Sequence, residues 1–541
     1  MQVGAPNVTI QDASVRNYIK ELEAQNQALQ ARYEQQVSKT NKIQTALLEY
    51  QNKYLITKER LDLLLYRQFM RSAERLPSDA NQPLLFNGEG EEQEPEPPAA
   101  EERVEVKAYQ RRQQGRKPLD SKLPRKERII DLSDSEKTCA CGAELTRIGE
   151  ETSEKLHIIP MQIWVERIIR PKYACRCCEG TESEGAAPTV RIAPVEPSII
   201  PKSIASANLL SWIFTHKFED HLPYYRQEKQ FERIGATISR QDMSNWQQQV
   251  YHNLSPLFVL LKETVKSGPV IQMDETVVQV MREAGRDYTD KSYMWLARGG
   301  PPEQKVVWYE YHETRAGYNA KQFLEGYSGY LQTDGYQGYD TAVEDMPEII
   351  HVGCFAHARR KFFEAAKVAE KPRSAEEGIK HIRKLYYLED ALRGKYGKEE
   401  ERPLFLSDRK ARAEPILDDF KKWLMKRQAE VPPSLKLGQA IQYTLNQWDK
   451  LVAYLESPYL TPDNNACENA IRPFVLGRKN WLFCQSPKGA ESSCGIYSLI
   501  ETAKQNDIVP LHYLTALFQK APLASAPVDW LKLLPWNIFS P

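Results

Sequence analysis

The sequence predicts a multidomain α/β protein with a mixed-sheet core, preceded by a long helix, a small cysteine-rich β module and a helical region. The 541-residue chain is too long for a single hydrophobic core. Residues 15–71 contain neither proline nor glycine, as a long helix requires. After Gly268 the pattern runs three strands, a helix, a strand, a helix and a strand, which is typical of a mixed sheet in an α/β layer.

Composition limits the class of protein. Hydrophobic residues make up 41% and charged residues 27%, values usual for soluble globular proteins. We expect no membrane partner and no secretion, because we find neither an apolar run of about 18 residues nor a secretory signal. Nine cysteines are too few for a disulfide scaffold. Five of them lie between Cys139 and Cys178, which favours a metal site in a reducing cytoplasm.

The N-terminal segment, residues 14–72, is predicted to form a zipper-like coiled coil. A heptad reading places Leu22, Leu29 and Ile43 on one seam, among several polar residues. Asn26, at the other seam position of the heptad, is a residue of the kind that sets the register of a coiled coil. We therefore expect a homo-oligomer, the alternative being a long amphipathic helix that packs on its own protein.

Charge is segregated although the net charge is zero. A zero sum taken alone argues against a nucleic-acid partner, but an acidic, proline-rich stretch is followed by a basic one. We expect an acidic disordered linker over residues 76–106 and a basic arm over 107–135. Arg116 and Lys117 in this arm suit a narrow DNA minor groove, although a solvated linker is equally compatible.

Residues 136–185 are predicted to form a zinc-binding β module. The two cysteine pairs Cys139/Cys141 and Cys175/Cys178 flank an alternating segment that reads as a hairpin. Four thiolates can close a structural tetrahedral Zn²⁺ site. The one-residue spacer between Cys139 and Cys141 weakens the first pair, and buried cysteines without metal are the alternative.

Residues 195–266 are predicted to form a helical DNA-binding region. The pattern breaks near Gly235, and Ser239 is placed to cap a following helix that carries Arg240 and Trp246. This arrangement resembles a helix-turn-helix, although ordinary helical packing produces similar patterns.

Three carboxylates carry the predicted chemistry. Asp274 interrupts an apolar strand, and Asp334 follows another strand and precedes a glycine. Acids in such positions are costly unless they pair or bind a cation. Hard oxygen ligands indicate Mg²⁺ or Mn²⁺, and Glu468 from a helix would complete a site for two ions. Each acid taken singly is also compatible with a surface or capping role.

Basic and aromatic residues near these acids are predicted to hold DNA. Arg472, Arg478, Lys479 and Lys488, with Trp481 among them, suit contacts to a phosphate backbone. His357, Arg359 and Arg360, at the predicted start of the helix after residues 349–354, suit a contact with phosphate as well. We expect no metal site shared by His351 and Cys354, because their odd spacing on a strand places them on opposite faces. The residues expected to contact DNA are Arg116, Lys117, Arg240, His357, Arg359, Arg360, Arg472, Arg478, Lys479, Trp481 and Lys488.

Several long blocks resemble the insertion-sequence-66 transposases. They are "MDET" at 273–276, "LQTDGYQGY" at 331–339, "HVGCFAHARRKFFEA" at 351–365, the stretch 464–490 and "LPWN" at 534–537. The resemblance covers nearly the whole chain, including the zipper-like helix and the cysteine module. It implies a bacterial, nucleoid-associated enzyme, often accompanied by small accessory proteins of the same element.

The resemblance also implies an RNase-H-like catalytic core with a DDE triad at Asp274, Asp334 and Glu468. The core would comprise residues 268–366 and 458–510, interrupted by a helical insertion over 367–457 and followed by a C-terminal tail over 511–541. We therefore predict a Mg²⁺-dependent DNA transposase that binds element ends, hydrolyses a phosphodiester and joins the 3′-hydroxyl to target DNA. An RNase-H-like nuclease or resolvase that does not join, and a catalytically silent DNA-binding regulator, are the alternatives.

Overall fold

The computed structural model describes residues 13–69, 162–174, 190–369 and 372–539. The chain divides into two compact units, residues 1–87 with 193–541, and residues 88–192. The predicted acidic linker, the basic arm with Arg116 and Lys117, and the four zinc-binding cysteines lie outside the described residues.

The smaller unit contains a two-stranded antiparallel ribbon. Strand β1 (Lys172–Ala174) pairs with β2 (Val190–Ile192), with Tyr173 opposite Arg191. The predicted hairpin had both strands between the two cysteine pairs. The partner of β1 instead follows the second pair, so the described ribbon brackets Cys175 and Cys178 in sequence.

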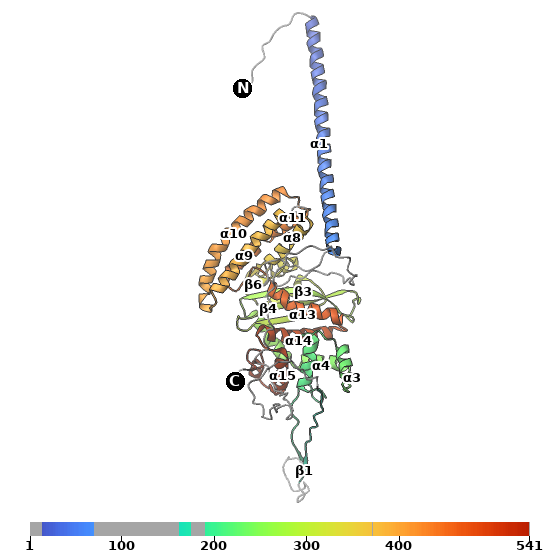
Figure 1. Cartoon of the computed structure of the whole chain (residues 1–541), viewed down its shortest axis with the longest axis vertical. Helices are drawn as coiled ribbons and strands as arrows, with labels where there is room; N and C mark the ends of the chain where they lie inside the picture. The colour runs from blue at the N-terminus through green and yellow to red at the C-terminus, as the bar shows by residue number, and fades with distance from the viewer. Residues whose placement is uncertain (1–12, 70–161, 175–189, 370–371, 540–541) are drawn as a thin grey trace, which may run out of the picture. The chain divides into compact units, whose positions relative to one another are not determined.

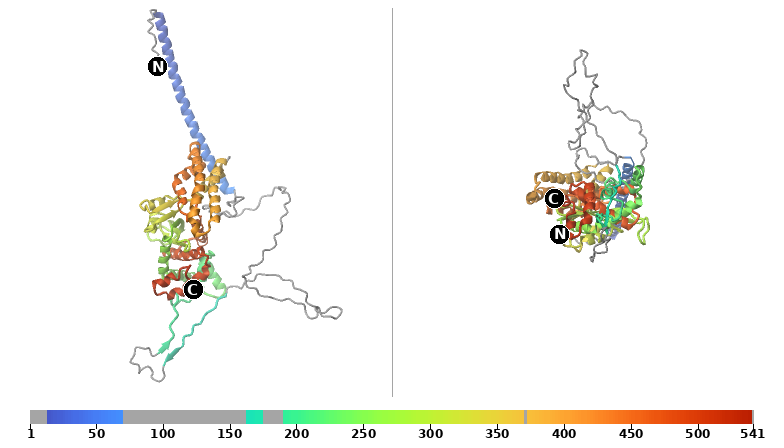
Figure 2. Two further views of the ribbon diagram at one scale, coloured as in Figure 1. Left: turned by 90° about the vertical axis from the view of Figure 1, so that its left-hand side faces the viewer. Right: turned by 90° about the horizontal axis from the view of Figure 1, so that it is seen from below.

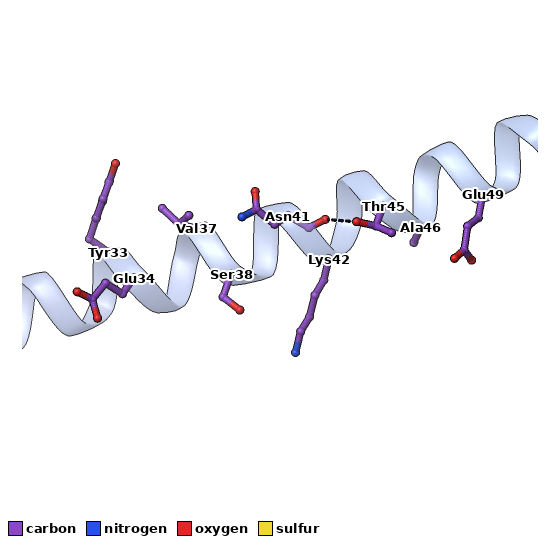
Figure 3. A pocket seen from close by; sticks show the side chains of 9 residues that line it. All are labelled: Tyr33, Glu34, Val37, Ser38, Asn41, Lys42, Thr45, Ala46 and Glu49. Carbon is purple, nitrogen blue, oxygen red and sulfur yellow. Dashed lines mark hydrogen bonds between the residues drawn. The ribbon is translucent and has the colours of Figure 1, made fainter. Parts of the chain in front are cut away.

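The helix α1 (Ala13–Phe69) is a single uninterrupted helix of 57 residues. Its apolar seam side chains are exposed in this chain, with Leu29 at 63% and Ile43 at 68%. Figure 3 shows the stretch from Tyr33 to Glu49, whose side chains border an open hollow along one helix rather than an enclosed site. No helix among the described residues is long and apolar enough to cross a bilayer.

Four helices precede the sheet. They are α2 (Ala207–Phe218), α3 (Tyr224–Arg233), α4 (Arg240–Asn253) and α5 (Ser255–Lys266). The predicted break and cap are confirmed, because Gly235 has φ +84° in the turn and Ser239 caps α4. The Ser239 hydroxyl accepts the Asp242 N–H at 3.1 Å, and the Asp242 carboxylate accepts the Ser239 N–H at 3.3 Å. This reciprocal capping box fixes where α4 begins.

The central sheet is mixed and has five strands. They are β3 (Val270–Gln279), β4 (Lys291–Gly299), β5 (Val306–His312), β6 (Gly329–Gln332) and β7 (Ile349–Val352), arranged in the order β5-β4-β3-β6-β7. The first three strands form an antiparallel meander, and β6 and β7 run parallel to β3. The sheet therefore changes from antiparallel to parallel pairing at β3, its central strand (Figure 1).

Short helices connect the later strands. Helix α6 (Gly317–Leu324) precedes β6, and α7 (Gln337–Val343) follows it. Strand β6 ends at Gln332, two residues before Asp334, and the chain turns into α7. The Asp334 carboxylate accepts the Tyr336 N–H at 2.9 Å in this turn, a local bond that competes with continuation of a strand.

The edge strand β5 is covered by α14 (Pro487–Gln505). Buried hydroxyls of this helix accept the strand's N–H groups, Ser498 from Tyr309 at 2.9 Å and Thr502 from Val307 at 3.1 Å. These bonds satisfy donors that an edge strand would otherwise expose. The preceding helix, α13 (Asn465–Trp481), packs on β3 and β4.

The predicted insertion consists of helices with their own apolar core. After α8 (Phe355–Val368) come α9 (Arg373–Lys395), η2 (Glu399–Glu401), α10 (Arg402–Glu430), α11 (Lys436–Asn446), α12 (Trp448–Val452) and η3 (Ala453–Glu456). The long helices α9 and α10 lie side by side in Figure 1 and Figure 2. The fully buried Arg409 of α10 donates to Glu389 and to the carbonyls of Tyr454, Ser457 and Leu460. It thereby ties the insertion to the segment that returns to the sheet.

The C-terminal residues pack on the main core. They form α15 (Pro510–Lys520), η4 (Ala521–Leu523) and α16 (Pro527–Leu531). Tyr513 and Leu517 on α15 and Leu534 after α16 are buried in the same cluster as the sheet. The segment we expected as a tail is therefore part of the folded core.

Candidate active site

The strand register places Asp274 and Asp334 at the same level of the sheet. Strands β3 and β6 run parallel with Gln272 opposite Gln332. Each aspartate follows its glutamine by two residues, so Asp274 within β3 and Asp334 just after β6 lie near the carboxyl end of β6. Residues two apart on extended chain share a face, and the two carboxylates therefore come from adjacent strands on one side.

A buried line of polar side chains supports this level of the sheet. Arg298 donates to Gln272 Oε1 at 2.9 Å, and Gln272 donates to Gln332 Oε1 at 2.8 Å. Gln332 in turn donates to the carbonyl of Thr461 at 2.7 Å. Thr461 precedes α13, so this chain of hydrogen bonds holds the start of that helix against β3 and β6.

Asn464 brings the third acid to the same place. Its side chain donates to the Met273 carbonyl at 3.0 Å, and its N–H donates to Cys354 Sγ at 3.2 Å. The predicted helix start is confirmed, because α13 begins at the next residue and carries Glu468 in its first turn. The Glu468 side chain is only 12% exposed.

The three acids influence one another electrostatically. Burial, together with Glu275, Asp334 and Glu468, raises the pKa of Asp274 well above its usual range. Burial also raises the pKa of Glu468; Arg360 opposes that rise, Asp463 and Asp334 add to it, and Arg472 opposes it more weakly. Asp334 raises the pKa of both Asp274 and Glu468, and Glu468 raises that of Asp274, so the three carboxylates lie within electrostatic reach of one another.

Two residues of α8 contact Glu468. His357 Nδ1 is 3.6 Å from Glu468 Oε1, and an Arg360 guanidinium nitrogen is 3.5 Å from Oε2. Burial and the nearby Arg360 lower the pKa of His357 to about 4, so its imidazole is neutral at pH 7. Both had been expected to contact phosphate; neither pattern nor spacing in the sequence indicated that they contact Glu468.

These residues fit divalent cations. Among the described residues, Glu468 Oε1, His357 Nδ1 and Asn464 Oδ1 are buried and accept or donate no hydrogen bond. Buried polar atoms without partners are rare, and a cation or its bound water would satisfy them. Like-charged carboxylates such as Asp274 and Glu468, whose pKa values are raised, gain stability from a hard cation. The donor set therefore suits Mg²⁺ or Mn²⁺.

Glu275, next to Asp274, faces the other way and is fully paired. Its carboxylate accepts hydrogen bonds from Arg315 at 2.6 Å and from the Tyr339 hydroxyl. Its N–H donates to Asp274 Oδ1 at 2.8 Å. Arg315 also lies over the Tyr336 ring at 3.9 Å. This cluster fixes the strand at Asp274 and links it to the turn after Asp334; sequence reasoning missed it.

Some of the predicted DNA contacts need correction. Arg359 is 8% exposed and points into the fold rather than to a substrate. Arg478 donates to the Val277 carbonyl and to Thr276 Oγ1, so it braces α13 on β3. Trp481 packs on the core with its ring 5.4 Å from that of Phe474, a position taken up by protein rather than by a base.

Three of the predicted DNA contacts are exposed. Lys479 and Lys488 are exposed at the end of α13 and the start of α14, and Arg240 is exposed at the start of α4. Arg472 is partly buried one turn beyond Glu468. The ring of His351 lies 2.8 Å from Thr333 and 2.8 Å from Asp340, and Cys354 lies beyond the end of β7, at the start of α8.

Comparison with known proteins adds family evidence. The family "Transposase IS66 family" matches residues 202–492, and "IS66 C-terminal element" matches 498–536. The description "zinc-finger binding domain of transposase IS66" matches residues 136–179, and "Transposase C of IS166 homeodomain" matches 57–128.

Similar curated proteins come from Sinorhizobium fredii (strain NBRC 101917 / NGR234). The chain is 31% identical to the uncharacterized protein y4jD over 430 residues, covering 77% of this chain and 81% of that protein. It is also 31% identical to the uncharacterized protein y4qI over 459 residues, covering 80% and 81%. The family matches extend over more than half of the sequence and reach from the N-terminal helix to the C-terminal core. The chain belongs to the IS66 family of transposases, with DNA-binding and zinc-finger elements.

Proposed function

We propose that this transposase has an RNase-H-like core in which Asp274, Asp334 and Glu468 form a DDE triad. The proposal is supported by the mutual electrostatic influence of these three acids, which come from two adjacent strands and the first turn of a helix. The sheet order, an antiparallel meander followed by two parallel strands, supports the fold assignment. The helical insertion between Asp334 and Glu468 does not prevent this convergence, because Arg409 and Gln332 anchor the returning segment.

The chain's own residues position the reaction. Asp274 and Asp334 present carboxylate oxygens from the sheet, and Glu468 presents a third from α13. Bound Mg²⁺ or Mn²⁺ ions would activate a water or 3′-hydroxyl and stabilise the leaving oxygen in phosphoryl transfer. Arg360 holds Glu468 Oε2, and the Gln272–Gln332 pair keeps the two aspartates at one level. The site then serves two steps, hydrolysis at the element end and joining of the freed 3′-hydroxyl.

DNA contacts and assembly complete the proposal. Lys479 and Lys488 suit backbone phosphates beside the site, and Arg240 suits DNA from the start of α4. We assign Arg116 and Lys117 to the DNA-binding arm and Cys139, Cys141, Cys175 and Cys178 to structural Zn²⁺. The exposed seam of α1 suits a coiled coil that pairs protomers. The work would take place at the bacterial nucleoid, in the cytoplasm, with accessory proteins of the same element.

The test uses the purified chain with labelled element ends, supplied intact and pre-nicked, in the presence of Mg²⁺. Glu468→Gln keeps size and hydrogen bonding but removes a charge, and we expect cleavage and joining to fall about 10³-fold or more, since a metal contributes several kcal/mol to the transition state. Glu456→Gln, at an exposed glutamate of the insertion, is the matched control and should retain activity.

The two rival functions predict other outcomes. Cleavage of intact ends without joining of pre-nicked ends would identify a nuclease or resolvase. Binding of DNA without any Mg²⁺-dependent reaction would identify a silent regulator. Equal activity of Glu468→Gln and the wild-type chain would overturn the triad.

A further inference from the structure

We infer that His357 is a further metal ligand of this site, its Nδ1 binding the same cation as the neighbouring Glu468. The inference rests on the proposed function, because Glu468 is the shared ligand. It assigns His357 to the cation rather than to a DNA phosphate.

The geometry places two ligand atoms face to face. His357 Nδ1 and Glu468 Oε1 are 3.6 Å apart, too far for a hydrogen bond. Two ligands about 2.1 Å from a common ion at 90–109° lie about 3.0–3.4 Å apart. A small movement of either side chain therefore lets both bind one ion.

Both atoms lack other partners within the part of the chain that the structure describes. Each is buried and makes no hydrogen bond. Leaving buried polar atoms unpaired costs about 1–3 kcal/mol for each group, so a common cation would remove two penalties at once. Arg360 contacts the other oxygen of Glu468, Oε2. The cation would therefore bind on the His357 side of the carboxylate and leave the Arg360 contact in place.

Cys354 is the other candidate in this cluster. One ligand atom each from Cys354, His357 and Glu468 lies within 4.8 Å of the others. The sulfur of Cys354, however, accepts the Asn464 N–H at 3.2 Å and is 2% exposed at the start of α8. That contact helps to hold α13 in place. The histidine is thus the added ligand, and the cysteine supports the helix that carries Glu468.

An imidazole changes which ions the site prefers. Mg²⁺ favours oxygen ligands, whereas Mn²⁺ and the later divalent metals accept nitrogen readily. The wild-type site should therefore bind Mn²⁺ more tightly than Mg²⁺. Loss of His357 should weaken Mn²⁺ binding about 10-fold or more, the scale on which even the partners of metal ligands act, and should change Mg²⁺ binding much less.

The test measures nitrogen bound to Mn²⁺ by electron spin-echo envelope modulation, in the full chain with its zinc module loaded. The wild-type protein should show the signal of a directly bound imidazole nitrogen, and His357→Gln should lose it. His381→Gln is the control, because His381 stacks on Phe420 in the insertion with ring centroids 5.2 Å apart. Thermal unfolding of the metal-free variants checks that they fold. If His357→Gln does not fold, His357→Asn is used in its place.

Glu468→Gln distinguishes failure of the His357 inference from failure of the proposed triad. If Glu468→Gln abolishes Mn²⁺ binding and the wild-type chain shows no bound nitrogen, His357 is not a ligand and the triad stands. If Mn²⁺ binding does not depend on Glu468, the triad itself fails and the inference fails with it. Retention of the nitrogen signal in His357→Gln would also overturn the inference.

Discussion

Asp274 lies near three other carboxylates, and its ionisation is unfavourable without a cation. Burial and the neighbouring Glu275, Asp334 and Glu468 raise its pKa. Residues arranged for function in this way commonly reduce stability. The raised pKa of Asp274 and the Oε1 of Glu468, which makes no hydrogen bond among the described residues, have the same explanation: the site binds a cation.

Replacing Asp274 by Asn should stabilise the metal-free protein. The change removes a carboxylate from a repulsive cluster, and stabilising substitutions of this kind contribute about 0.5–2 kcal/mol. Mg²⁺ should raise the unfolding temperature of the wild-type chain but not that of the variant. Thermal unfolding in chelator and in Mg²⁺ measures both effects. A less stable metal-free variant, or one that Mg²⁺ still stabilises, would contradict this role for Asp274.

The difference in stability between metal-free Asp274→Asn and the metal-free wild-type chain should decrease as the pH falls. The folded pKa of Asp274 is raised above its unfolded value of about 3.9, so the folded state favours the protonated acid. Its penalty is therefore present above the folded pKa and is lost as pH falls toward the unfolded value. The stability gap between Asp274→Asn and the wild-type chain in chelator should shrink between neutral pH and about pH 4. A gap that widens on acidification would mean that Asp274 is stabilised by a cationic neighbour.

At the scale of elements, the start of α13 is held by the side-chain amides of Asn464 and Gln332, which bond to backbone carbonyls, rather than by a capping hydrogen bond. Asn464 makes no side-chain capping bond; its amide instead reaches the Met273 carbonyl. Gln332 reaches the Thr461 carbonyl. The position of Glu468 is thus set by β3 and β6, the strands next to Asp274 and Asp334.

Gln332→Leu should lower the rate of catalysis without weakening DNA binding. The variant leaves Gln272 and the Thr461 carbonyl without their partner, and a misplacement of about 1 Å costs about 10²-fold in rate. We expect kcat for end cleavage to fall about 10–100-fold with little change in KM for DNA. Gln337→Leu, at an exposed position on α7, is the control. A rise in KM with unchanged kcat would instead assign Gln332 to substrate binding.

Sequence patterns predicted some elements well. The apolar and aromatic runs that form β3, β4 and β5 and the Ser239 cap have local causes, and the structure confirms them. Residues 337–343 form α7 because Asp334 bonds the Tyr336 N–H, a competition that periodicity does not reveal.

The environment of the site depended on tertiary contacts and was harder to predict. The pattern placed Asp274, Asp334 and Glu468 together through the resemblance, since a gap of more than a hundred residues separates the last two. Arg359 and Arg360 are adjacent in sequence, but one is buried in the fold and the other contacts Glu468. Tertiary contacts of α8, which packs on α9 and α11, separate their roles.

At the scale of the whole molecule, α1 presents an apolar seam that suits a second copy of the chain. Leu22, Leu29 and Ile43 are exposed along a helix of 57 residues. Long helices with such seams are marginal unless the seam packs against a partner. Pairing of two protomers would bring two element ends into one assembly.

Replacing Leu22, Leu29 and Ile43 together by Lys should therefore dissociate the oligomer. Light scattering after size-exclusion chromatography should show a smaller species, while Mn²⁺ binding at the catalytic site is retained. Lysines at the exposed polar positions Gln27 and Gln44 are the control. An unchanged mass in the seam variant would place self-association elsewhere in the chain.

The most direct test of the central claim is mobility of a marked element in cells that supply any accessory genes, comparing the wild-type chain with Glu468→Gln. If the three carboxylates form the catalytic site, mobility is lost while the variant still folds and binds element ends. If the variant moves DNA as well as the wild-type chain does, Glu468 serves only as a partner of Arg360 and His357, and the metal site is wrong.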